Sequence, residues 1–221
     1  MIKQLKIGFK MLRHTHGIVS CTLGVIICFL FGVVMMVSPA SSEILGNAVG
    51  AYFIGMVPIF IMQMFYSLQA SSMIATSAYA KKMQTSIPSL VSGIGYIITY
   101  AVVAGIQMVK AYITPENSGY IALETVLLAV LWLVFASYMG AALKYFVIST
   151  ILFFTFFCII SMVLNIGRFF GFALDIPVWT AGVLGFVIVI AGCFAQYGIS
   201  LLLYKRPMSK YAQLSSLRKT M

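Results

Sequence analysis

Six long apolar stretches, separated by short polar segments, make up most of the sequence. They cover approximately residues 17–37, 48–68, 87–109, 120–142, 145–166 and 178–204. A helix needs about 20 mainly apolar residues to cross the roughly 30 Å of hydrocarbon in a bilayer, and each stretch is long enough. The alternating pattern of a β-barrel is absent, and a helix satisfies its own backbone hydrogen bonds in lipid. The pattern predicts an all-α integral membrane protein with six transmembrane helices, called spans one to six.

The basic residues predict how these spans are oriented. Twelve of the 14 Lys and Arg residues fall at the N-terminus, after span two, after span four and in the C-terminal tail. Because Lys and Arg accumulate in cytoplasmic segments, both termini are predicted to be cytoplasmic. The outer loops would then lie around residues 38–47, 110–119 and 167–177. They contain no Asn-x-Ser/Thr motif, which favours a bacterial source and a plasma-membrane location. The net charge of +10 is thus a topology signal and gives no evidence for nucleic acid.

The composition excludes the soluble classes of protein. Of the 221 residues, 62% are hydrophobic and only 8% are charged, and the mean hydropathy is +1.06. A soluble domain has about 25% charged residues. Cytosolic enzymes, disordered tails and secreted disulfide scaffolds are therefore excluded. The four cysteines all lie in apolar stretches, so we interpret them as core residues.

The segments at the two ends of the chain are basic. In residues 1–16, apolar positions recur at helical spacing, and basic positions repeat that spacing one residue later. This predicts an amphipathic helix in the membrane interface, with a simple basic flank as the alternative. Residues 205–221 form a polar, basic tail, for which attraction to anionic lipid is a sufficient explanation. Residues 17–204 make up the transmembrane domain between them.

The connection between spans two and three is the longest internal one. Ser71–Gln84 is rich in small and hydroxylated residues and contains neither Gly nor Pro. Since Ser and Thr can cap a short helix, we expect a cytoplasmic helix here that packs on a partner. A plain solvated loop is the alternative.

Glu124 is the one clear ionisable residue inside a span, about one turn from the outer edge of span four. Such residues are costly to bury and are normally functional. At this depth Glu124 can reach headgroups or water, so it would either have a structural or interfacial role or line a substrate or ion path. No second carboxylate lies near it within a span, and metalloprotease, serine-hydrolase and ATPase phosphate-loop motifs are absent. We therefore assign no catalytic, cofactor-binding or metal-binding residue, and we expect that this chain is not an enzyme.

Span five is unusually aromatic. Its phenylalanines are Phe146, Phe153, Phe154, Phe156 and Phe157. Two interpretations stay open: the rings face lipid, or they form the wall of an amphiphile path or a subunit interface.

Three parts of the sequence resemble the small membrane subunit of a type-2 ABC exporter. They are the basic amphipathic segment Met1–Arg13, the helix-like connection Ser71–Gln84 and the tight turn Leu143–Tyr145. Six spans with cytoplasmic ends and a basic tail complete the likeness, which covers essentially the whole chain. The last outer loop is short for the re-entrant helices of larger relatives.

The resemblance implies that two membrane subunits, identical or different, work with two separate ATPase subunits, which bind Mg-ATP. Met1–Arg13 would be the connecting helix and Ser71–Gln84 the coupling helix that receives the ATPase stroke. The coupling residues would be Ser71, Ser72, Tyr79, Lys81 and Lys82. The residues flanking the substrate path would be Gln63, Tyr66, Phe153 and Phe157, with Glu124 as a further candidate. The substrate would be an amphiphile: a peptide, as in resistance to antimicrobial peptides, a drug or a lipid-like molecule.

Two other classes remain open. The substrate-capture subunit of a vitamin importer also has six spans and is near this length, but its helical contacts would lie in span one and not in Ser71–Gln84. An intramembrane enzyme would use Glu124 and would lose all activity on Glu124→Gln.

Overall fold

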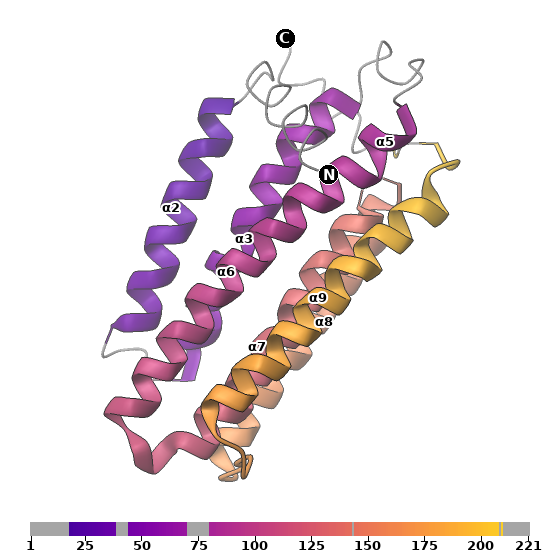
Figure 1. The fold of residues 1–221 in the computed structure, drawn as a ribbon. Coiled ribbons are helices and arrows are strands. Elements are labelled where there is room, and N and C mark those ends of the chain that lie inside the picture. The colour runs from indigo at the N-terminus through magenta and orange to yellow at the C-terminus, as the bar shows by residue number, and fades with distance from the viewer. Residues whose placement is uncertain (1–17, 39–43, 70–79, 143, 208, 210–221) are drawn as a thin grey trace.

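The computed structural model describes residues 18–38, 44–69, 80–142, 144–207 and 209, which contain helices and connecting turns but no strand (Figure 1). The elements are α2 (Ile18–Val37), α3 (Ile44–Gln69), α5 (Ala80–Gln84), α6 (Ser86–Ile113), the 3-10 helix η2 (Pro115–Asn117), α7 (Ser118–Ala141), α8 (Phe146–Phe169) and α9 (Val178–Leu203). Among the described residues, six helices are long and apolar enough to cross a membrane. This confirms the predicted all-α fold and the number of candidate spans, whereas the orientation of the two termini stays a prediction. The predicted interfacial helix 1–16, and Ser71–Tyr79 of the predicted coupling helix, lie outside the described residues.

α3 and α6 each extend four residues beyond the predicted spans, and these extensions bring the polar residues Asn47 and Lys110 into helices. α3 begins at Ile44 and not at residue 48, and α6 runs to Ile113 and not to residue 109. The prediction that Asn47 and Lys110 lie in outer loops is therefore wrong, because both lie within helices. The physical reason is that hydropathy marks only the part of a helix suited to hydrocarbon, whereas a helix continues wherever its backbone hydrogen bonds persist.

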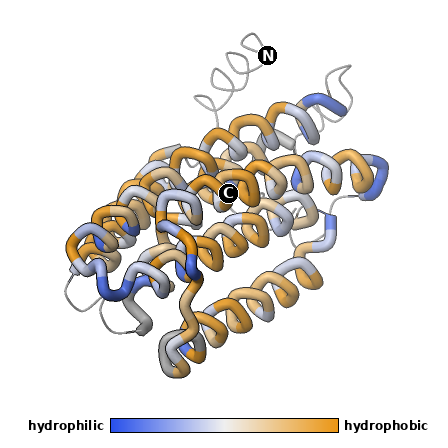
Figure 2. Tube along the Cα trace, turned by 60° about the horizontal axis from the view of Figure 1, so that its bottom comes forward, coloured by the Kyte–Doolittle hydropathy of each residue, from blue (hydrophilic) through white to orange (hydrophobic). Residues whose placement is uncertain are grey.

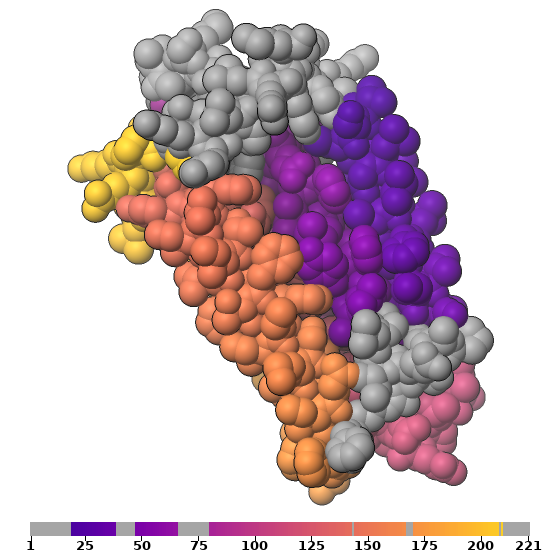
Figure 3. Space-filling model, turned by 180° about the vertical axis from the view of Figure 1, so that it is seen from behind, coloured from indigo at the N-terminus to yellow at the C-terminus, as the bar shows by residue number. Residues whose placement is uncertain are grey.

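The central helix of the bundle is α7. It packs against α9, α8, α6 and α3, whereas α2 packs mainly on α3 at the edge of the bundle (Figures 1 and 3). α2 and α8 are the spans with the smallest buried fraction of residues, and their exposed faces are apolar. Figure 2 shows that apolar residues run along the helices while hydrophilic residues gather at their ends. This distribution is the one expected of helices surrounded by lipid tails.

The two ends of the bundle differ in charge. The end that carries α5, the α7–α8 turn and the residues after α9 is called the basic end; its described charged residues are Lys81, Lys82, Lys144, Lys205 and Arg206 (Figure 1). The opposite end carries η2 and the α8–α9 connection, with exposed Glu116 and Asp175. Within the described residues, acidic side chains thus occur only toward the opposite end.

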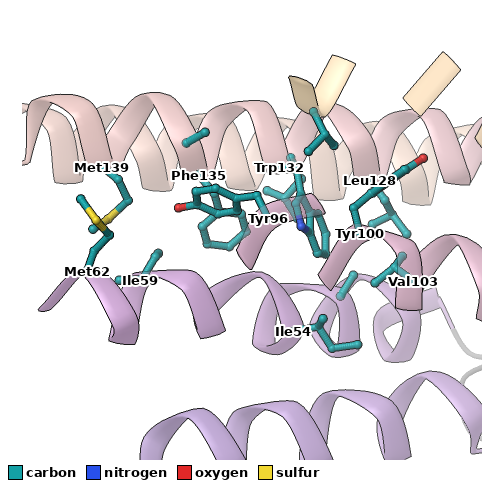
Figure 4. Close-up of a cluster of buried hydrophobic side chains, with 14 of the residues drawn as sticks. Ile54, Ile59, Met62, Tyr96, Tyr100, Val103, Leu128, Trp132, Phe135 and Met139 are labelled. Atoms are coloured by element: carbon teal, nitrogen blue, oxygen red, sulfur yellow. The ribbon is translucent and has the colours of Figure 1, made fainter. Parts of the chain in front are cut away.

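The core lies where α7 faces α6 and α3 (Figure 4). Four α7 residues spaced four, three and four apart form its inward stripe: Leu128, Trp132, Phe135 and Met139. Trp132 Nε1 donates a hydrogen bond to Thr99 Oγ1 of α6 at 3.0 Å. The Tyr100 and Trp132 rings also meet edge to face, with centroids 6.0 Å apart. Aromatic packing and this buried hydrogen bond therefore fix the position of α6 along α7.

Glycines allow the closest helix contacts. A Cβ on Gly50 would lie 2.8 Å from the carbonyl oxygen of Gly32, and one on Gly32 would lie 2.7 Å from that of Gly50. A Cβ on Gly192 of α9 would lie 2.9 Å from Leu133 Cα of α7. Because apolar burial gives little driving force between helices in lipid, such close packing is a main source of stability.

We predict that Gly50→Ala destabilises the protein, because the α2 and α3 backbones must separate to admit the methyl group. The expected loss is about 1–3 kcal/mol, as for other overpacked contacts. Gly105→Ala is the matched control, since a Cβ there has no neighbour within 4 Å. Thermal unfolding of the purified protein in lipid or detergent is the measurement. Equal midpoints for the two variants would show that the glycine contact does not hold α2 on α3.

Candidate functional site

A charged hydrogen-bonded chain, called the polar relay, joins three helices toward the opposite end. It consists of Asn47 of α3, Lys110 of α6 and Glu124 of α7. Asn47 Nδ2 donates to Glu124 Oε2 at 3.3 Å, and Lys110 Nζ donates to Asn47 Oδ1. Glu124 is only 3% exposed, whereas Asn47 and Lys110 are half-buried. The amide thus bridges a buried carboxylate and an ammonium group from different helices.

In the polar relay, Glu124 makes a contact between helices that the sequence indicated only in part. A structural contact was one of the two predicted roles, and the hydrogen bond from Asn47 is such a contact. Sequence reasoning missed Asn47 because it placed this residue in a loop. An asparagine within one turn of an apolar run was the available signal, since amides there form hydrogen bonds between helices. A role of Glu124 along a substrate path stays a prediction.

The predicted path residues fall on the contact between α3 and α8. Phe153 is 5% exposed, and its ring centroid lies 5.0 Å from those of both Phe135 and Tyr138, so this ring belongs to the core. Phe157 is half-buried, and its ring lies 4.8 Å from that of Tyr52 on α3. The side chain of Tyr66 lies outside the described residues.

Gln63 is exposed on the same face of α3 as Tyr52. It comes eleven residues after Tyr52, which is just over three complete turns of an α-helix. Tyr52 and Phe157 are in ring contact, so this face of α3 runs beside α8. Gln63 and Phe157 therefore lie along one side of the bundle, whereas Phe153 lies behind that side.

At the basic end, α5 is anchored to α6. Ala80 and Met83 are buried, while Lys81 and Lys82 are exposed. Thr85 alone separates α5 from α6, and its backbone N–H donates to the carbonyl of Lys81 at 3.1 Å. The Ser89 N–H donates in turn to the carbonyl of Thr85 at 3.2 Å. Helical hydrogen bonding thus continues through the junction, so a displacement of α5 would be transmitted to α6.

Lys144, in the turn between α7 and α8, ties three segments of the basic end together. Its Nζ donates to Gln84 Oε1 of α5 at 3.4 Å and to the carbonyl oxygen of Arg206, after α9, at 2.7 Å. Burial lowers the pKa of this ammonium below its ordinary value, because part of its hydration is lost. Lys144 therefore couples α5 to the ends of α7, α8 and α9.

Two of the five predicted coupling residues, Lys81 and Lys82, are described, and they lie side by side on α5. Ser71, Ser72 and Tyr79 lie outside the described residues. Sequence reasoning gave Lys144 only a topological role, because the pairing of a turn residue with α5 cannot be seen in the sequence. No group of His, Cys, Asp and Glu suited to a metal ion occurs among the described residues.

Comparison with protein-family models, curated proteins and solved structures finds no match for this chain.

We predict that Glu124→Gln destabilises the protein by about 1.5–3 kcal/mol, the usual value of a hydrogen bond to a charged group. The variant keeps the shape of the side chain but leaves Lys110 without the nearby negative charge. Chemical or thermal unfolding in detergent is the measurement. Glu116→Gln, at an exposed acidic residue of η2, is the control and should change stability little. If the two variants are equally stable, the relay does not hold the three helices together.

Proposed function

We propose that this chain is the membrane subunit of a type-2 ABC exporter, which moves an amphiphilic substrate across a bacterial plasma membrane with a separate ATPase subunit. The observation that carries the proposal is the anchoring of α5. It presents two lysines outward, joins α6 without a break in helical hydrogen bonding, and is tied by Lys144 to the ends of three other helices. A force applied to α5 would therefore reach most of the bundle.

The charge distribution supports a cytoplasmic basic end. The exposed lysines of α5, together with Lys144, Lys205 and Arg206, form an electropositive surface without a described acidic residue. Such a segment is normally retained in the cytoplasm, where ATP is available. Both termini would then be cytoplasmic. ATP and Mg²⁺ would be bound by the ATPase, because this chain has no phosphate-binding loop.

A second membrane subunit would complete the transporter. The least covered helices, α2 and α8, offer broad apolar faces on which another membrane chain or lipid can pack. Gln63 and Phe157 lie along the α3–α8 side, and a path for an amphiphile there would combine apolar walls with an occasional polar group. Phe153 would support this wall from within the core.

The proposal predicts that Lys81→Gln combined with Lys82→Gln weakens retention of an ATPase subunit when the tagged chain is purified from its native membranes. Exposed ion pairs contribute about 0.2–1 kcal/mol each, so a loss of about two- to thirtyfold in affinity is expected for the two lysines together. Lys205→Gln combined with Arg206→Gln removes the same charge outside α5 and is the matched control. The remaining basic residues keep the topology signal in both variants.

Three outcomes of this purification would contradict the proposal. One is that no ATPase accompanies the wild-type chain. Another is that the α5 variant and the control retain the ATPase equally well. A tightly bound vitamin in the absence of an ATPase would instead identify the chain as a substrate-capture subunit of an importer.

A further inference from the structure

Gln107 of α6 is completely buried although its side chain is a polar amide. Its exposed fraction is 0%, and within the described part of the chain neither Nε2 nor Oε1 has a hydrogen-bond partner. Leaving such a group without a partner in an apolar interior is unfavourable, and native proteins usually satisfy it with ordered water when no side chain does so. The Gln107 amide therefore needs a bound hydrogen-bonding molecule, called the guest, as its partner.

The position of Gln107 on α6 directs it into the bundle. Tyr96, Tyr100, Val103 and Gln107 follow one another at spacings of four, three and four residues, and all four are fully buried. Figure 4 shows Tyr100 and Val103 on the face of α6 that meets Leu128 of α7. Lys110, the α6 member of the polar relay, is the next residue of this stripe.

The contacts between α6 and α7 place Gln107 level with Glu124. The two helices form an antiparallel hairpin across η2, and Thr99 of α6 bonds to Trp132 of α7. Gln107 comes eight residues after Thr99, and Glu124 comes eight residues before Trp132. Each step is about 12 Å along its helix in the same direction. The unsatisfied amide and the buried carboxylate therefore lie at the same depth in the bundle.

We propose that Gln107 and the polar relay line one internal site between α3, α6 and α7 that holds a small hydrogen-bonding molecule. Water is the molecule always available, and an internal water needs two to four polar partners. The Gln107 amide supplies donors and an acceptor, and the Glu124 carboxylate supplies acceptors. The guest satisfies Gln107 and hydrates the charged relay, so it holds the α6–α7 hairpin against α3. This site is independent of the proposed transport function.

Gln107→Leu tests whether the site beside Gln107 contains a bound polar molecule or is empty of one. If it is occupied as proposed, leucine removes the partner of the guest, and the thermal unfolding midpoint of the purified protein falls by about 3–8 °C. If the space is dry, leucine removes an unsatisfied amide and the midpoint rises. Gln63→Leu is the control, because this exposed glutamine of α3 lies 16 residues after Asn47, about 24 Å along the helix from the site. A midpoint for Gln107→Leu at or above that of Gln63→Leu overturns the proposal.

Cysteine labelling gives a second test that does not depend on how well the leucine variant folds. In a chain whose four native cysteines are replaced by Ser, Gln107→Cys and Val103→Cys are reacted with a small charged methanethiosulfonate in nanodiscs. Both positions are completely buried, and Val103 lies one turn deeper on the same stripe. A hydrated site predicts labelling at least about tenfold faster at 107 than at 103, because the reagent reacts with thiolate in water. Equal rates at the two positions would overturn the proposal.

Discussion

In the hydrocarbon of a membrane no water is present to hydrogen-bond with a buried polar side chain, so each such group must find its partner inside the protein. This constraint accounts for the polar contacts of the bundle. Trp132 meets Thr99 between α7 and α6, and Gln196 Nε2 donates to Ser92 Oγ at 2.8 Å between α9 and α6. The polar relay satisfies a buried carboxylate by the same means. Hydrogen bonds thus set the register of helices that apolar packing alone would leave free to slide.

The tightly packed interior of the bundle lies between two ends that differ in their chemistry. Close glycine contacts and interhelical hydrogen bonds hold the middle of the bundle together. At the basic end, Lys144 replaces part of its lost hydration with the side chain of Gln84 and the carbonyl of Arg206. Because helical hydrogen bonding continues from α5 into α6, a partner that bound and displaced α5 would also displace α6. The proposed coupling to an ATPase rests on this connection between α5 and α6.

The six spans could be predicted because length and hydropathy are the properties that a bilayer selects. The site could be predicted only in part. Glu124 stood out as a charge in an apolar run, but Asn47 did not, because its partners are 63 and 77 residues away in the sequence. The aromatic character of α8 was evident, whereas the burial of Phe153 depends on rings supplied by α3 and α7. Contacts between distant helices are fixed by side-chain shape, which one sequence without relatives does not reveal.

Site-specific photocrosslinking at the basic end would show whether α5 contacts an ATPase in the native membrane. A photoreactive amino acid is placed at position 82 of α5, or at the exposed position 116 of η2 at the opposite end, and native membranes are irradiated. If α5 docks an ATPase, position 82 crosslinks to a protein with a nucleotide-binding phosphate loop, and position 116 does not. Crosslinks from position 82 to lipid alone, or to an ATPase from position 116, would contradict this docking.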